Sequence, residues 1–311
     1  MTKVLQLAKR IAEFPGKSWS QKVSSFATRW NRWFPGFPPP VLLPNGTWWL
    51  FEMNFIGSSI LEGGYENAEC NFERRFLKPG MTALDIGANC GFHSLLLSKS
   101  VGPGGRVLAF EPSPSDRKKL RVNLAMNFCR NVSVLPWALG EEDGDATLYV
   151  VEGNTVLNSL RSQANAKTAT PTRVVVRPLD KVLRELRVEK VDFIKLDVEG
   201  AELPVLKGAA RLLGTVPRPV ILCEVQEETS RAWGYSSRQI VELLSAREFV
   251  WFRLDDHGDL VPVTEERSGF GRNLVAVPAE SLQSVAPLRA SAKSEGNPIS
   301  ADEFATSRGA Q

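Results

Sequence analysis

Few cysteines and no long apolar run characterise this sequence, and each shortage excludes a class of protein. The 311 residues include four cysteines, none in a C-x-x-C pair or at the spacing of a zinc site. Reduced thiols in a cytoplasmic protein are therefore expected rather than disulfides. No apolar run reaches the roughly 18 residues of a membrane-spanning helix. The N-terminus also lacks the apolar stretch of a secretory signal.

The sequence also has no large excess of positive or negative charge. The 38 Lys and Arg nearly balance the 35 Asp and Glu, so the net charge of +3 gives no reason to expect a nucleic-acid partner. A hydrophobic content of 43% with 23% charged residues suits a globular protein with a sizeable core. One large domain with appended ends is expected.

The N-terminal 40 residues differ from the rest. Residues 1–35 hold seven Lys or Arg, six Phe or Trp and a single acid, Glu13. Val23, Phe26 and Trp30 recur at helical spacing and form an apolar stripe with basic flanks. Such a helix can lie on an anionic membrane surface, or it can pack on the domain or remain poorly ordered. The Pro-rich residues 36–40 end this leader.

Apolar runs then alternate with helical patterns. This alternation predicts an α/β, Rossmann-like fold, a mostly parallel sheet with helices on both faces. Residues 41–61 form an aromatic cap or hairpin, 62–280 the main domain, and 281–311 a small, polar tail predicted to be disordered. Predicted strands are residues 82–86, 106–110, 132–139, 147–151, 173–177, 191–198, 219–225, 250–254 and 273–277, with helices at 62–77, 202–213 and 236–249 and a capped helix beginning at Ser113–Pro114.

The first of these strands, residues 82–86, leads into a glycine loop at residues 87–91. Gly87 and Gly91 allow a sharp turn and a close approach to a ligand. The next strand ends at Glu111, 26 positions after Asp85, where a carboxylate can accept both hydroxyls of a ribose. This arrangement predicts a cofactor that contains adenosine.

The loop sequence D-I-G-A-N-C-G indicates which adenosine-containing cofactor the site would bind. A dinucleotide site would read G-x-G-x-x-G and hold a pyrophosphate. Here Asp85 precedes the first glycine; it would repel a pyrophosphate but could accept from an ammonium. S-adenosylmethionine carries an ammonium and a sulfonium and no phosphate, so it fits better. A nicotinamide-dependent oxidoreductase is the second enzyme hypothesis.

Ligands of open α/β sheets lie beyond the carboxyl ends of the strands. This rule selects the candidate site residues without an alignment. Those predicted to bind the cofactor are Asp85, Gly87, Asn89, Gly91, Glu111, Pro112, Trp137 and Ala138, the last two flanking the adenine. Those predicted to be catalytic are Asp197, His93, Glu199 and Glu202.

Methyl transfer to an alcohol needs in-line positioning and removal of the alcohol proton. Asp197 or His93 could take this proton. Alternatively, Asp197 and Glu224 could hold a divalent cation that lowers the pKa of the alcohol. Glu199 and Glu202 could also stand where they do because a helix N-terminus favours acids.

Several stretches resemble the FkbM family of S-adenosylmethionine-dependent methyltransferases. They are LKPGMTALDIGANCGFHSLLL, VLAFEPSP, IKLDVEGAELPVLKG and VILCEV, and the likeness covers about residues 62–278. The resemblance implies a seven-stranded class I methyltransferase fold that acts at oxygen, on sugar hydroxyls or polyketide-type metabolites. It assigns the cofactor loop to Asp85, Gly87, Asn89 and Gly91, the ribose acid to Glu111, and the second motif to Lys195, Asp197, Glu199 and Glu202. The leader lies outside the family's core.

The sequence therefore predicts a cytoplasmic O-methyltransferase, peripheral to a membrane if residues 1–35 bind one. Its acceptor would be a small molecule, a glycan or a lipid-linked compound, and no nucleic acid. A non-catalytic interaction module at a membrane surface is the alternative from another class. Keeping an acidic cluster beside an intact cofactor loop would serve no purpose in such a module.

Overall fold

The computed structural model describes residues 19–34, 37–43, 45–52, 55–151, 169–263 and 271–290. Residues 1–18 of the predicted leader and residues 291–311 of the predicted tail lie outside the described residues. None of the described helices is long and apolar enough to cross a membrane.

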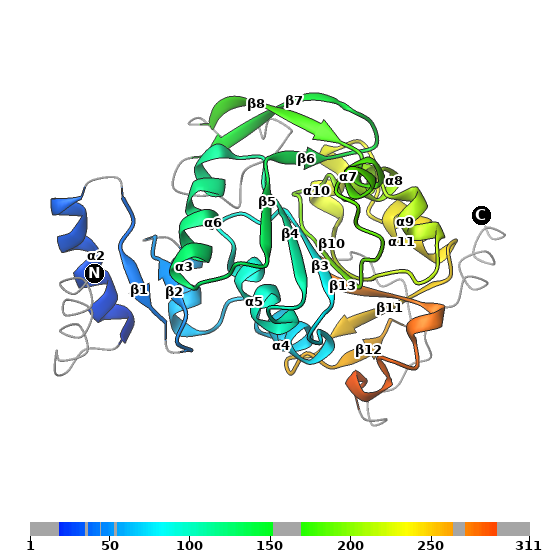
Figure 1. Ribbon diagram of the computed structural model, residues 1–311, viewed down its shortest axis with the longest axis horizontal. Helices are drawn as coiled ribbons and strands as arrows, with labels where there is room; N and C mark the ends of the chain where they lie inside the picture. The colour runs from blue at the N-terminus through cyan, green and yellow to red at the C-terminus, as the bar shows by residue number, and fades with distance from the viewer. Residues whose placement is uncertain are drawn as a thin grey trace.

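The centre of the molecule is an eight-stranded sheet of order β12-β11-β13-β10-β9-β3-β4-β5 (Figure 1). Five neighbouring strands, β10 to β5, run parallel, and β13 pairs antiparallel with both β10 and β11. The mostly parallel sheet is as predicted, with β12 added at one edge as the partner of β11. The strands are β3 Thr82–Ile86, β4 Arg106–Phe110, β5 Val132–Leu135, β9 Phe193–Leu196, β10 Val220–Gln226, β11 Phe249–Leu254, β12 Leu260–Pro262 and β13 Gly271–Pro278.

Two apolar cores cover the two faces of this sheet. Alternate residues of β3 illustrate the division: Leu84 and Ile86 belong to one core, and Ala83 belongs to the other. The first core is completed by α7 Leu179–Glu185, α8 Glu202–Lys207 and α11 Arg238–Ser245. The second is completed by α4 Asn67–Phe76 and α5 Phe92–Val101. Strands buried on both faces explain the near-continuous apolar runs of the sequence.

The predicted strand at residues 132–139 is wrong as one element. It divides at Pro136, which has no N–H to donate to a ladder. β5 stays in the main sheet, whereas the following residues join a second sheet of order β6-β8-β7. The strands of this sheet are β6 Trp137–Leu139, β7 Gly144–Val151 and β8 Ala169–Arg177.

The predicted helix at 62–77 is also two elements. α3 Phe55–Glu62 ends at Gly63, whose φ of +73° is left-handed, and α4 begins after Glu66, whose φ is +43°. The remaining short helices are α9 Ala210–Gly214 and α10 Glu227–Ala232.

The boundary predicted at residue 281 lies too early. Two turns of 3-10 helix, Ala279–Ser281 and Ala286–Leu288, continue the chain, and Val285 is fully buried in the second core. A single bridge joins Arg289 to Leu260 of β12. Val285 and Leu288, with the partly buried Leu282, hold this stretch on the domain.

The N-terminal segment stands at one end of the molecule (Figure 1). It consists of α2 Trp19–Trp33 and a hairpin of β1 Pro40–Leu42 with β2 Trp48–Leu50, followed by α3. The hairpin is attached to α6 Pro114–Met126, whose N-terminus is capped by Ser113 as predicted. Asn123 of α6 accepts from the Leu50 backbone N–H at 2.9 Å and donates to the Cys90 carbonyl at 2.8 Å. One buried amide thus joins the hairpin to the glycine loop.

Asn123→Ala should lower the free energy of unfolding by about 2 to 4 kcal/mol, because it leaves a buried N–H and a buried carbonyl without partners. Urea denaturation would measure the change. Lys118→Ala, at an exposed position of the same helix, should stay within about 0.5 kcal/mol of the parent. Equal stability of the two variants would contradict the role of this amide.

Candidate active site

A cavity opens at the carboxyl ends of β3, β4 and β9, the edge of the sheet that the sequence rule selects. The N-terminal hairpin and α3 form one wall of it and the β6 sheet forms another. The wall residues from the hairpin, from α3 and from the segments that follow them are Trp49, Leu50, Glu52, Gly57, Ile60 and Tyr65; those from the second sheet are Trp137, Ala138, Leu139 and Leu148.

The glycine loop lies against the end of β9. Gly87 has a φ of +88°, and a Cβ added there would clash with the carbonyl oxygen of Asp197. Gly91 has a φ of +92°, and a Cβ there would clash with Leu120 of α6. Both positions therefore require glycine, for conformation and for space. Asn89, between them, is also left-handed, with a φ of +48°.

Glu111 closes the far side of this loop. Its carboxylate accepts from the backbone N–H of Asn89 at 2.7 Å and from that of Ser113 at 2.7 Å. Burial, followed by the nearby Asp116, raises the pKa of Glu111 to about 8. A carboxylate held by two backbone donors and lining the cavity is preorganised to accept from a ligand hydroxyl.

Asp85 lies at the cavity floor and is almost fully buried. It accepts from the Ser94 hydroxyl at 2.5 Å. Burial raises the pKa of Asp85 above its usual range, against the pull of Lys195 and His93. The negative form of this carboxyl is therefore costly in the free protein and would be stabilised by a cationic ligand.

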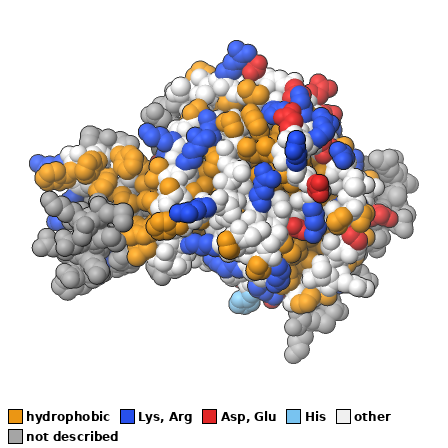
Figure 2. Space-filling model, viewed as in Figure 1, with side chains coloured by type: hydrophobic (Ala, Val, Ile, Leu, Met, Phe, Trp, Pro, Cys, Tyr) orange, Lys and Arg blue, Asp and Glu red, His pale blue; other side chains and the backbone are white. Residues whose placement is uncertain are grey.

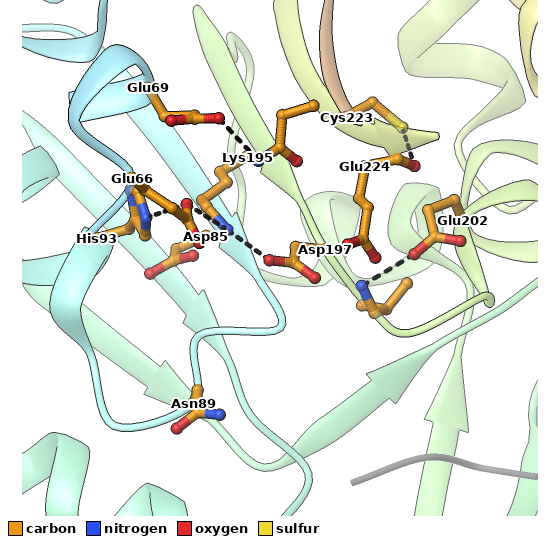
Figure 3. Close-up of polar contacts among 12 residues, drawn as sticks. Glu66, Glu69, Asp85, Asn89, His93, Lys195, Asp197, Glu202, Cys223 and Glu224 are labelled. Carbon is orange, nitrogen blue, oxygen red and sulfur yellow. Dashed lines mark hydrogen bonds and ion pairs between the residues drawn. The ribbon is translucent and has the colours of Figure 1, made fainter. Parts of the chain in front are cut away.

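Lys195 of β9 lies between two carboxylates, as Figure 3 shows. Its Nζ is 2.8 Å from Asp197 Oδ2 and 3.9 Å from Glu66 Oε2. Burial lowers the pKa of Lys195, but these carboxylates outweigh it and hold the pKa well above its usual range. The left-handed backbone of Glu66 brings its side chain to this position from the break between α3 and α4. Strained residues of this kind gather at functional sites.

The surroundings of His93 are not those of a general base. Its Nδ1 lies 2.9 Å from Glu73 and its Nε2 lies 2.8 Å from Glu66, so both ring nitrogens contact carboxylates (Figure 3 shows the second). Burial lowers the pKa of His93, but Glu73 and Glu66 outweigh it and raise the pKa to about 10. An imidazolium held on both sides has no lone pair to take a proton at neutral pH. The geometry gives His93 the role of a buried cation that fixes Glu66.

The acidic motif after β9 divides into two kinds of carboxylate. Glu202 points into the protein: its Oε1 accepts from the N–H groups of Val198 and Gly200 at 3.0 and 3.2 Å, and it is outside the cavity lining. Burial raises the pKa of Glu202 to about 7. This carboxylate shapes the loop between β9 and α8.

Glu199 is the other kind, because it lines the cavity. Its φ of +54° is left-handed, and its carbonyl accepts from Trp233 Nε1 at 3.3 Å. Its carboxylate has no hydrogen-bond donor among the described residues. Burial, followed by Asp197 and Glu202, raises the pKa of Glu199 to about 8. A carboxyl with a pKa near neutrality that faces a cavity has the properties of a general base.

Glu224, the second predicted metal ligand, lies beside Asp197 in Figure 3 but outside the cavity lining. Its Oε1 accepts from Gln226, and burial, followed by Asp197, raises its pKa to about 9. Among the described residues, the one group of three side chains whose ligand atoms could share a metal is Cys70, Glu73 and His93, away from Glu224. The cation predicted at Asp197 and Glu224 receives no support from this geometry.

The cavity lining thus brings together most of the predicted residues. Seven of the eight predicted cofactor residues line it; Gly91 is instead the N-cap of α5. Of the predicted catalytic residues, Asp197, His93 and Glu199 line it and Glu202 does not. Sequence reasoning missed Glu66 and Glu73, whereas the wall residues Trp49 and Ile60 fall in the aromatic cap, residues 41–61, that the sequence predicts. The Gly63–Gly64 pair that interrupts the predicted helix was the signal that could have found Glu66.

A comparison with known families decides the class of protein. The model of the methyltransferase FkbM domain matches residues 85–259, more than half of the 311 residues. The chain belongs to this family. Its fold is Rossmann-like, and membership in a family of methyltransferases favours S-adenosylmethionine-dependent methyl transfer over the oxidoreductase and the non-catalytic hypotheses.

Three relatives show which kinds of methyltransferase this chain is similar to. Methyltransferase sdnD of Sordaria araneosa is 34% identical over 40% of this chain and 59% of its own length. Hexuronic acid methyltransferase AglP of Haloferax volcanii is 28% identical over 42% of this chain and 51% of its own. 2-O-methyltransferase NoeI of Sinorhizobium fredii is 28% identical over 56% of this chain and 74% of its own. The chain spans about half to three quarters of these relatives.

The residues of the FkbM methyltransferase site fit S-adenosylmethionine. The cofactor carries two cationic groups and a ribose diol, and the cavity offers buried carboxylates at Asp85 and Glu111 on either side of the glycine loop. The buried charge cluster also contains more acids than bases, since His93 and Lys195 face Glu66, Glu73, Asp85 and Asp197. A cationic ligand would offset this imbalance.

Proposed function

We propose that this FkbM methyltransferase transfers the methyl group of S-adenosylmethionine to a hydroxyl oxygen of a sugar, a glycan or a small secondary metabolite. The observation that carries the proposal is Glu199, which lines the cavity and whose carboxylate has no hydrogen-bond donor among the described residues. A hydroxyl must lose a proton to be methylated, whereas a thiolate or a neutral amine needs no base. A free carboxylate is therefore most useful to an enzyme that methylates oxygen.

The two carboxylates after β9 differ in what they can do. Asp197 is bound to Lys195 at 2.8 Å, whereas the carboxylate of Glu199 has no hydrogen-bond donor among the described residues. We assign Asp197 to orienting the acceptor hydroxyl and Glu199 to accepting its proton. S-adenosylmethionine supplies the electrophilic methyl group when bound. His93 and Lys195 keep Glu66 charged, and Lys195 fixes the position of Asp197.

The composition of the cavity walls supports a sugar or a flat metabolite as the acceptor. Trp49 and Trp137 line the cavity from the hairpin and from β6, and their rings offer apolar faces. The relatives AglP and NoeI, named for hexuronic acid and for 2-O-methyl transfer, point in the same direction. A screen with methyl-labelled S-adenosylmethionine against sugars, matched thiols and matched amines tests the proposal. Transfer only to thiols or amines would contradict it.

The rate of methyl transfer should depend on pH through Glu199. Because a base acts in its deprotonated form, and burial raises the pKa of Glu199 to about 8, kcat should rise with pH and level off above about 8 to 9. Initial rates at saturating cofactor between pH 6 and 10 would measure the profile. In Glu199→Asp the rise should remain with a shifted midpoint, whereas a flat parent profile would remove this base from the mechanism.

A further inference from the structure

Helix α2 packs on the rest of the protein through the apolar face that, from the sequence, could have met a membrane. Val23 and Ala27 are buried, and Phe26 packs beside them against the hairpin and α3. Of the predicted stripe, Val23 is therefore interior, and Phe26 and Trp30 are half-buried. This agrees with the alternative that the helix packs on the domain, and it leaves little of the stripe available to a bilayer.

The C-terminal end of α2 exposes different aromatic side chains. Trp33 is 78%, Phe34 53% and Phe37 44% exposed. Of the large hydrophobic side chains that the described residues expose, these three stand within five positions of one another. Isolated exposed apolar residues are ordinary, but a cluster at the tip of one element marks an interaction surface. We name Trp33, Phe34 and Phe37 the aromatic tip.

The aromatic tip is held in place by the backbone around it. Phe34 donates to the Trp30 carbonyl at 2.8 Å, and Trp30 Nε1 donates to the Phe37 carbonyl at 2.9 Å. The rings of Trp30 and Phe34 lie 4.6 Å apart, and Trp30 contacts Phe26 in turn at 5.7 Å. This row of rings connects the exposed tip to the buried end of α2.

The charge around the tip has one sign. Between Glu13 and Glu52 the sequence holds no Asp or Glu, and the described part of this stretch holds Lys22, Arg29 and Arg32. Arg32 is exposed beside Trp33 in the last turn of α2. Figure 2 shows the same arrangement, with hydrophobic and basic side chains at the α2 end and the visible acidic ones elsewhere.

We propose that the aromatic tip with Arg32 docks this protein on the surface of an anionic phospholipid bilayer. Aromatic side chains prefer the interfacial region, and basic residues are attracted to anionic headgroups. A soluble acidic protein would complement the charge but would gain less from three aromatics at a protruding tip, because they would need a matching apolar pocket. The hairpin that α2 packs on also forms the cavity wall at Trp49, so docking would bring this wall near the membrane. The proposal does not depend on the identity of the acceptor.

Sedimentation of the full chain with vesicles tests the proposal. Phosphatidylcholine vesicles should retain little protein, an equal mixture of phosphatidylcholine and phosphatidylglycerol should retain most of it, and high salt should release it. Trp33→Asn should lower the affinity for the mixed vesicles by about tenfold or more. Arg32→Glu should lower it by about fivefold or more and weaken the salt dependence.

Phe128→Asn is the matched control. Phe128 is 79% exposed, as Trp33 is, but lies just beyond the C-terminal end of α6, and Asn suits its left-handed φ of +58°. This variant should bind vesicles like the parent, and all three variants should keep the circular dichroism spectrum and S-adenosylmethionine affinity of the parent. Absence of vesicle binding, equal loss with Phe128→Asn, or a homodimer that Trp33→Asn dissociates would each overturn the proposal.

Discussion

Asp85→Asn should weaken S-adenosylmethionine binding by at least about a hundredfold and leave the fold intact. Removing one partner of a buried, charged contact costs about 2 to 5 kcal/mol of binding free energy, and about 2.7 kcal/mol corresponds to a hundredfold change in Kd. Asn keeps the shape and the hydrogen bond from Ser94 but cannot offset a cation. Calorimetric titration with S-adenosylmethionine would measure the change.

The free energy of unfolding of ligand-free Asp85→Asn should not fall along with its affinity for the cofactor. Burial raises the pKa of Asp85, so its carboxylate costs free energy in the protein without a ligand. Asn at this position should therefore leave the free protein as stable as the parent or more so. Asp192→Asn is the control. Asp192 accepts from the backbone N–H of Thr82, which begins β3, whereas Asp85 lies near the other end of this strand, at the cavity. A parental Kd for Asp85→Asn, or a loss of stability equal to that of Asp192→Asn, would contradict the role of Asp85.

The second large effect is expected from Glu199→Gln. Loss of a general base lowers a rate about 10²- to 10⁴-fold, so kcat on the true acceptor should fall by at least about a hundredfold. The affinity for S-adenosylmethionine should stay close to that of the parent, since Glu199 follows β9 whereas Glu111, the acid predicted to bind the ribose, follows β4, two strands away in the sheet. Initial rates at saturating cofactor and acceptor would measure kcat separately from KM.

Glu228→Gln controls for the loss of one negative charge nearby. Glu228 is exposed on α10 and lies outside the cavity lining. It should keep the parental kcat. A Glu199→Gln enzyme with parental kcat would direct the search for the base to Asp197.

The sequence predicts those parts of the site that the local backbone determines. Gly87 and Gly91 need left-handed conformations, and Glu111 follows a strand, so spacing alone places them at one edge of the sheet. The direction of a side chain is harder to predict. Glu199 and Glu202 are three positions apart, yet one faces the cavity and the other bonds to the backbone inside the loop, because Gly200 and Glu199 are both left-handed.

Contacts between segments that lie far apart along the chain could not be predicted from the sequence. His93 stands in the expected helix, but its carboxylate partners come from α4 and from the residue before it, about 20 to 27 positions earlier. The apolar stripe of α2 shows the same limit. Periodicity identifies an apolar face but does not say whether that face meets the protein or a membrane.

The shared amide of Asn123 has a consequence for the order of events in a catalytic cycle. It bonds both to the hairpin that forms one wall of the cavity and to the glycine loop that we expect to hold the cofactor. A ligand that tightens either partner tightens the other, and such coupling acts equally in both directions. Acceptor and cofactor should therefore bind with positive cooperativity, and the protein should hold its acceptor least well after the cofactor's product has left.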